Sequence, residues 1–164
     1  MAVKMCLIFL VLAFIASVNG SSADDMVMIS YNWAHQDVAL SLYHNLTANG
    51  VNTWIDVYNM SSANNLAQAM GETIESAKMV LICFSEAYQK SLNCQHEALY
   101  AFDLKKPLVF AKFQEDFTPT GWLGFIQAYH QYYSFYNGAD FDENFDKLLQ
   151  NIKKGEEMFL EEFE

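Results

Sequence analysis

This sequence of 164 residues contains no arginine, and the 9 residues counted as Lys or Arg are all lysines. A phosphate-bearing ligand would therefore be held by lysine, backbone N–H groups or helix N-termini, since no guanidinium fork is available. Basic charge is also scarce overall, and the 20 acidic residues give the chain a formal net charge of −11. This balance argues against nucleic acid or an anionic membrane surface as the main partner, because both attract cationic proteins.

Cysteine and proline are scarce as well, with 3 and 2 residues. Cys6 lies in a leading apolar stretch, and Cys83 and Cys94 are too few for a disulfide scaffold. Neither the cysteines nor the histidines have the spacing of metal ligands, so no metal site is predicted. Apolar residues are plentiful: 52% of the chain is hydrophobic and 15% aromatic, enough for the core of one domain.

The first 20 residues have the layout of a secretory signal peptide. Lys4 precedes an apolar run over residues 5–16, and small or polar residues close the segment. This run is short for a membrane-spanning helix, which needs about 20 apolar residues. We therefore predict a signal peptide over residues 1–20 and a secreted or lumenal protein. The membrane becomes a partner only if the leader stays uncleaved, and translation from Met26 or Met28 would leave the protein in the cytoplasm.

From residue 26 onward, short apolar runs alternate with segments of helical periodicity. The runs typical of buried parallel strands cover residues 27–29, 51–55, 79–84, 107–113 and 132–136. Such alternation predicts successive βαβ units. The expected fold is α/β and flavodoxin-like, a three-layer, open, parallel five-stranded sheet with helices on both faces.

Three segments between and after these strands carry more specific expectations. Ser85 is expected to cap a helix that continues to about residue 104. Residues 117–127 contain Pro119 and Gly121 and are predicted to form a loop. Apolar residues at helical spacing over residues 141–152 predict a closing helix, so the domain is expected over residues 26–153, with an acidic tail over residues 154–164.

Ligands of open parallel sheets bind beyond the carboxyl ends of the strands. The segments expected to meet there are residues 30–33, 56–65, 85–88 and 112–116. A phosphoryl-accepting receiver is excluded, because it would need acidic residues where the chain has Ser30, Tyr31 and Ser85. A flavin-binding flavodoxin is excluded too, because residues 31–35 offer no phosphate loop rich in glycine and hydroxyl groups.

Seven segments, taken in order, resemble the TIR (Toll/interleukin-1 receptor) domain family, and most of all its TIR-only, NAD-cleaving branch. They are residues 27–31, 51–56, 72–77, 81–88, 91–97, 106–107 and 121–123. The resemblance implies a role in signal transduction and innate defence, by one of two functions. The first is a glycohydrolase or cyclase that cleaves NAD+ at the nicotinamide–ribose bond. The second is a non-catalytic module that assembles signalling complexes through homotypic TIR–TIR contacts.

Two departures from the family pattern bear on this choice. The loop over residues 56–65 lacks the Arg-Asp and Pro-Gly pairs of receptor and adaptor TIR domains, which favours the enzyme. Asn93 stands where many enzymatic TIR domains have a tryptophan, which favours the interaction module.

The resemblance assigns the catalytic carboxylate to Glu97, on the helix after the third strand. A spacing of three between Ser91, Cys94 and Glu97 predicts one stripe along that helix. A lone carboxylate suits this chemistry, because nicotinamide departs as a neutral molecule and needs no acid, unlike the leaving group of a glycosidase. The carboxylate would stabilise the positive charge that develops on the ribose. Nicotinamide would be released with ADP-ribose or a cyclic isomer of it, and the sequence leaves both open.

Residues at the ends of the strands are candidates for binding the substrate. They are Ser30, Tyr31, Trp33, Asp56, Met60, Ser85 and Cys94. An exposed Trp33 could stack on the nicotinamide or adenine ring, its alternative being a place in the core. Ser30 and Ser85 could bring backbone N–H groups to the pyrophosphate, their alternative being simple helix capping. No cofactor is expected because NAD+ is the substrate, and the expected partners are NAD+ and other TIR domains, including a second copy of this chain.

Overall fold

The computed structural model describes residues 26–59 and 65–161, with side chains described up to residue 155. Its strands form one all-parallel five-stranded sheet in the order β2-β1-β3-β4-β5. They are β1 (Val27–Tyr31), β2 (Thr53–Trp54), β3 (Met79–Phe84), β4 (Leu108–Lys112) and β5 (Tyr132–Ser134). The predicted α/β, flavodoxin-like fold class is confirmed.

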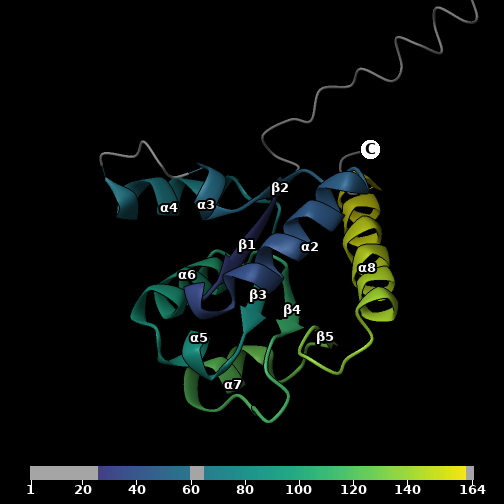
Figure 1. Cartoon of the computed structure of the whole chain (residues 1–164). Coiled ribbons are helices and arrows are strands. Elements are labelled where there is room, and N and C mark those ends of the chain that lie inside the picture. The colour runs from purple at the N-terminus through teal and green to yellow at the C-terminus, as the bar shows by residue number, and fades with distance from the viewer. Residues whose placement is uncertain (1–25, 60–64, 162–164) are drawn as a thin grey trace, which may run out of the picture.

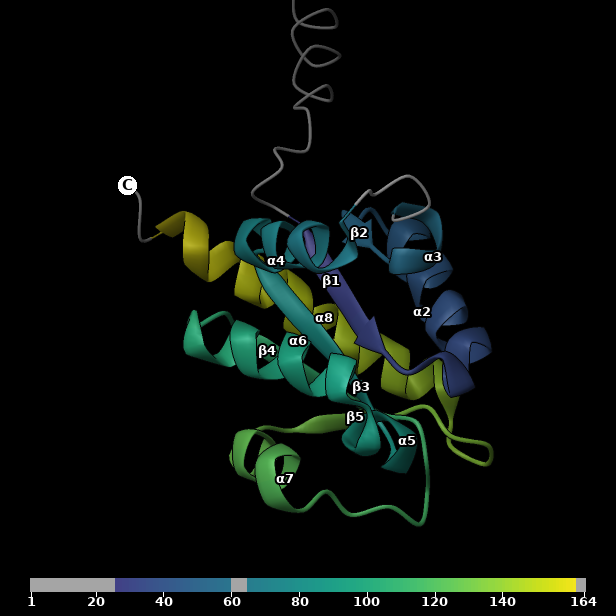
Figure 2. The same ribbon diagram turned by 90° about the vertical axis from the view of Figure 1, so that its left-hand side faces the viewer.

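Helices cover both faces of the sheet (Figure 1). One face carries α2 (Gln36–Ala48) and α8 (Phe141–Glu161). The other carries α4 (Leu66–Ser76), α5 (Glu86–Lys90), α6 (Leu92–Asp103) and α7 (Gly121–Gln127), which lie in front of the sheet in Figure 2. The short helices η2 (Trp33–His35) and α3 (Asp56–Asn59) follow the carboxyl ends of β1 and β2.

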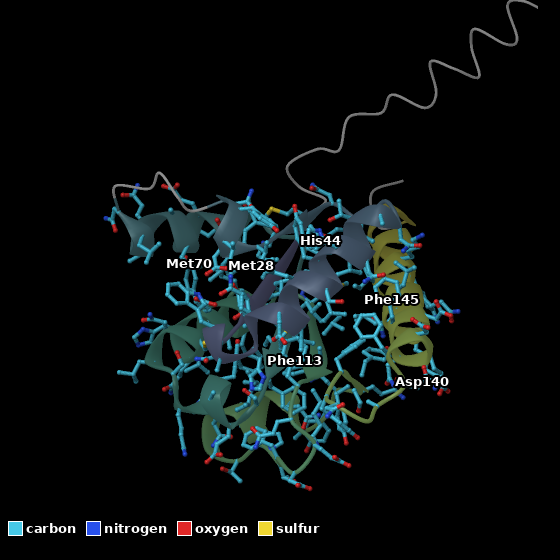
Figure 3. The ribbon with its side chains drawn as sticks, in the orientation of Figure 1. Met28, His44, Met70, Phe113, Asp140 and Phe145 are labelled. Carbon is cyan, nitrogen blue, oxygen red and sulfur yellow. The ribbon has the colours of Figure 1, made fainter. Side chains whose placement is uncertain are left out.

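Strand β1 is buried on both faces, and its side chains alternate between two hydrophobic clusters. Val27, Ile29 and Tyr31 pack with residues of α2 and α8, whereas Met28 packs with residues of α4 to α7. Figure 3 shows this division, with Met70 and Met28 on the α4 side and Phe145 on the α8 side. By the same alternation, Ser30 is a polar residue in the row that begins with Met28.

The single helix predicted between Ser85 and residue 104 is wrong, because Ser91 divides it into α5 and α6. Ser91 has an extended backbone, with φ −82° and ψ 120°, and its Oγ accepts a hydrogen bond from the Cys94 N–H at 3.4 Å. A serine in this conformation ends one helix and caps the next. Ser91 is therefore the N-cap of α6, three residues before Cys94 and six before Glu97, and lies outside the helix that holds them.

The loop predicted over residues 117–127 is also wrong in part, because residues 121–127 form α7. Leu123 and Ile126 are spaced about one helical turn apart and are fully buried against the sheet. Gly121 begins the helix with a positive φ of 54°. Burial of these side chains stabilises a short helix that Pro119 and Gly121 argue against locally.

The closing helix α8 continues to Glu161, so the segment expected as an acidic tail begins as helix. No helix within residues 26–59 and 65–161 is long and apolar enough to cross a membrane. The predicted leader, residues 1–20, lies outside the described residues, as does Met60.

Candidate active site

A cavity of about 640 Å³ lies beyond the carboxyl ends of β1 and β2 and is closed on one side by α6. Three aromatic residues, Tyr31, Trp33 and Trp54, contribute to its lining. Two carboxylates, Asp56 and Glu97, also line it. The cavity therefore combines flat apolar surface with negative charge, a combination suited to a ligand that carries a cationic aromatic ring.

The Glu97 carboxylate is hydrogen-bonded to a serine hydroxyl of strand β1. Ser30 Oγ donates a hydrogen bond to Glu97 Oε2 at 2.7 Å and lies 2.7 Å from Tyr88 Oη. Ser30 is 1% exposed, and its side chain contacts Glu97 rather than the cavity. The predicted approach of its backbone N–H to a pyrophosphate stays a prediction.

Burial raises the pKa of Glu97 from its usual value to about 7. The hydrogen bond from Ser30 lowers this pKa, because it favours the ionised form, and the negative charge of Asp56 raises it. Both protonation states are therefore populated near neutral pH. Perturbation of this kind by burial in a cleft is common at functional carboxylates.

Asp56 joins two aromatic residues of the cavity. Tyr31 Oη donates to Asp56 Oδ1 at 2.8 Å, and Trp33 Nε1 donates to Asp56 Oδ2 at 2.9 Å. The Val57 N–H also donates to Asp56 Oδ1 at 2.7 Å. Trp33 is 74% exposed, so of its two predicted places the core is excluded. Its indole is open to solvent yet fixed in orientation by the carboxylate.

Tyr31 is buried in the sheet, and its hydroxyl group reaches Asp56. Burial, followed by the hydrogen bond to Asp56, raises the pKa of Tyr31 well above its ordinary value. The phenol therefore stays protonated and acts as a donor to the carboxylate.

Cys94 lines the cavity beside Glu97, but its chemistry is that of a buried thiol. Its Sγ donates to the Tyr31 carbonyl oxygen at 3.6 Å, and burial raises its pKa. A thiol in this environment is a poor nucleophile, because the thiolate is the reactive form. Within the described residues, no group of three or more His, Cys, Asp or Glu side chains could hold a metal ion.

Other predicted positions lie apart from the cavity. Ser85 is fully buried, and its side chain accepts the Tyr88 N–H at 3.2 Å as the N-cap of α5, so the structure shows capping. Lys112, at the end of β4, has its Nζ 5.7 Å and 5.8 Å from the ring centroids of Tyr132 and Tyr136.

Of the four segments expected to meet, two line the cavity, residues 30–33 and the start of 56–65, together with residues of α4 and α6. The segment 85–88 is connected to the first and the last of the four through the hydrogen bonds of Tyr88 with Ser30 and of the Glu86 N–H with Gln114.

Two residues of the site had no functional role in the sequence prediction. Tyr88 reaches Ser30 through the core, and a tyrosine in an amphipathic segment gives no local sign of such a contact. Trp54 packs against the hydrophobic core and also lines the cavity. Its place two residues before Asp56, at the end of a strand, was the available signal.

Comparison with known proteins gives one family and several structures. The sequence model of the TIR domain family matches residues 27–149. The comparison with curated protein sequences finds no match. The fold is similar to the TIR domain of the Toll-related receptor TRR-2 from Hydra magnipapillata, with a TM-score of 0.64 and 16% identity over 77% of this chain and 97% of that one.

Two further solved structures are similar. The TIR domains of the activated Roq1 resistosome, which directly recognises the pathogen effector XopQ, match with a TM-score of 0.62 and 15% identity, over 78% of this chain and 99% of that one. The TIR-STING receptor from C. gigas, in complex with 2′,3′-cGAMP, matches with a TM-score of 0.62 and 17% identity, over 77% of this chain and 38% of that one. At these identities the likeness shows the fold alone.

Proposed function

Because the chain belongs to the TIR domain family, and because Glu97 lies in a cavity lined by aromatic rings, we propose that it cleaves NAD+ at the nicotinamide–ribose bond. The observation that carries the proposal is the pairing of a half-buried carboxylate, Glu97, with an exposed and oriented indole, Trp33, in one cavity. The enzyme would be an NAD+ nucleosidase acting in signal transduction and innate defence.

The reaction proceeds by loss of nicotinamide from the ribose. The bond between C1′ and the pyridinium nitrogen breaks, and its electron pair goes to the nitrogen, so nicotinamide leaves as a neutral molecule. Positive charge develops on the ribose ring, where the ionised Glu97 carboxylate stabilises it. Attack of water on C1′ with loss of a proton gives ADP-ribose, and attack by an adenine nitrogen or a ribose hydroxyl gives a cyclic isomer.

The aromatic lining supports binding of the cationic nicotinamide ring. The exposed face of Trp33 can stack on a pyridinium, and the attraction between a cation and an indole is the strongest of its class. The carboxylates of Asp56 and Glu97 add negative charge around the same cavity. A bound pyridinium would also favour the ionised form of Glu97, so the substrate would help to generate the reactive state of the enzyme.

Self-association of the chain belongs to this proposal. Phe102 of α6 and Phe125 of α7 touch on the surface, with ring centroids 6.0 Å apart, and Tyr129 nearby in the chain is 98% exposed. Exposed aromatic groups of this kind favour protein–protein contact. The same surface favours the second candidate function, a non-catalytic module that assembles signalling complexes through TIR–TIR contacts.

Release of nicotinamide tests the proposal directly. The purified protein is incubated at high concentration with NAD+, and the products are separated by chromatography, beside Glu97→Gln and Glu143→Gln. Glu143 is an exposed residue of α8 that pairs with Lys147, so its variant is a matched control. We expect nicotinamide from the parent and from Glu143→Gln, and almost none from Glu97→Gln.

The other outcomes separate the two candidate functions. Absence of nicotinamide with a folded, self-associating parent would contradict the enzyme and favour the interaction module. Equal release of nicotinamide by the parent and Glu97→Gln would support the proposed NAD+ cleavage but exclude Glu97 as its catalytic residue.

A further inference from the structure

A buried chain of hydroxyl groups ends on Glu97. It begins at Tyr88 of α5, passes through Ser30 of β1 and reaches Glu97 of α6, with 2.7 Å between the oxygens at each step. Tyr88 is 0% exposed and Ser30 is 1% exposed. Because Ser30 has one hydroxyl hydrogen and donates it to Glu97, the Tyr88 hydroxyl must donate to Ser30. The direction of both hydrogen bonds is thus toward the carboxylate.

We propose that Ser30 and Tyr88 are positioning residues that fix the orientation and the charge state of the Glu97 carboxylate. The catalytic meaning of this assignment rests on the proposed cleavage of NAD+. Neither side chain lines the cavity, so both act through Glu97. Ser30 engages Oε2, which leaves Oε1 as the oxygen available to the ribose.

The hydroxyl chain opposes the other influences on Glu97. Burial and the charge of Asp56 both favour the neutral carboxyl, whereas the Ser30 hydrogen bond favours the carboxylate. A hydrogen bond to an ionised acceptor is stronger than a neutral one, and a second donor behind it polarises the first. Tyr88 stays protonated, because burial and then the charge of Glu97 raise its pKa well above the ordinary value.

Other titratable groups also face Glu97 from the elements packed around it. Tyr31 of β1, Asp56 of α3 and Cys94 of α6 each interact with it electrostatically. The tyrosine and the cysteine have raised pKa values and stay neutral near pH 7. Of the groups around the carboxylate, the Ser30 hydroxyl is therefore the one whose contact directly favours ionisation.

Packing alone does not explain these two hydroxyl groups. Ser30 lies in a row of apolar side chains, and a buried hydroxyl costs desolvation that an apolar residue avoids. Phenylalanine would fill the space of Tyr88 against Trp122, whose ring centroid lies 6.3 Å away. The chain of hydrogen bonds that links both hydroxyl groups to Glu97 explains why the core holds a serine and a tyrosine here.

The titration of the Glu97 carboxyl tests the assignment without relying on activity. Its midpoint is measured by carbon-13 NMR, with Glu97→Gln used to assign the signal. We expect Ser30→Ala to raise the midpoint by about one pH unit, since a hydrogen bond to the charged form is lost. Tyr88→Phe should raise it by about half as much, because it acts through Ser30. Tyr133→Phe, a buried tyrosine of β5 on the opposite face, should leave it unchanged.

Kinetics supply the second readout. Both variants should lower kcat and move the rise of activity to higher pH, with KM nearly unchanged, because the carboxylate acts in the transition state. Unchanged midpoints in folded Ser30→Ala and Tyr88→Phe would overturn the assignment. If Ser30→Ala does not fold, Tyr88→Phe decides alone, because it keeps the ring. Raised midpoints with a parent that releases no nicotinamide would support the hydroxyl chain while contradicting the proposed function.

Discussion

The two faces of the sheet share their strands but differ in what their cores contain. On the face covered by α2 and α8, the helix α8 presents Phe145, Leu148 and Ile152 to an apolar cluster. On the face covered by α4 to α7, the apolar row is interrupted by Ser30, which leads to Glu97. Polar groups in a core cost stability unless they are paired, so the buried pairing of Ser30 with Glu97 indicates a role for this face beyond packing.

This difference predicts that substitutions on the two faces have separable effects. The α8 face supplies stability through buried area, which is lost when side chains are truncated. Under the proposed function, the α6 face supplies the chemistry through the Glu97 carboxylate, which the fold keeps partly out of water. Activity and stability should therefore be changed independently by choosing the face.

The largest expected effect is on catalysis, from a substitution of Glu97 that leaves the hydrophobic cores on both faces intact. Glu97→Gln should lower kcat by about 10²-fold to 10³-fold, a range typical of losing one electrostatic contact made in the transition state. The amide keeps the shape of the side chain and can still accept from Ser30. Steady-state release of nicotinamide measures the change, and a kcat within about threefold of the parent would exclude Glu97 as the catalytic group.

The sequence predicted the strands well, because buried parallel strands are continuous apolar runs. The run over residues 79–84 coincides with β3. The second predicted strand, residues 51–55, is shorter in the structure, since only Thr53 and Trp54 belong to β2 at the edge of the sheet. The choice of Glu97 rests on its distance along the chain from the third strand, which follows the family pattern, and the structure places Glu97 in the lining of the cavity.

Two of the misses, α7 and the contact of Tyr88, have a common physical cause, which is tertiary contact that local preference does not report. Pro119 and Gly121 favour a loop, but burial of Leu123 and Ile126 stabilises α7. The pairing of Tyr88 with Ser30 joins residues 58 positions apart in the chain. No periodicity or spacing in a single sequence reports a contact of that kind.

The second prediction concerns a substitution in the core on the face covered by α2 and α8. Leu148→Ala, at a fully buried position of α8, should lower the free energy of unfolding by about 3 kcal/mol, because it removes buried methyl groups and leaves a cavity. Well below the melting temperature, kcat should be unchanged. Denaturant unfolding and nicotinamide release measure the two effects. The exposed Gln150→Ala is the control, and a loss of activity in folded Leu148→Ala would contradict the separation of the faces.

The third prediction concerns the pH dependence of stability. The pKa of Glu97 is about 7 in the folded protein and 4.5 is its ordinary value, so between these the folded state holds a proton that the unfolded state has released. Stability contributed by this group therefore falls as pH rises, and the full loss of about 3 kcal/mol is reached above about pH 7.

Comparison of the parent with Glu97→Gln isolates that contribution, because all other titrating groups are shared. The stability of Glu97→Gln relative to the parent should increase between about pH 4.5 and about pH 8, by the amount given above. Urea unfolding at a series of pH values measures it. A difference that is constant with pH would show that the carboxyl titrates as it does in water.

The smallest expected effect lies at the rim of the cavity, where neither core is involved. Trp33→Ala removes the exposed indole and should raise KM for NAD+ by about fivefold to tenfold with little change in kcat, since stacking on a cationic ring supports binding rather than bond cleavage. Trp33→Phe keeps a ring but loses the hydrogen bond to Asp56, so it separates stacking from orientation. A KM between those of the parent and Trp33→Ala would show that both matter. Equal KM values in all three proteins would exclude Trp33 from the substrate site and restrict the functional face to the residues gathered around Glu97.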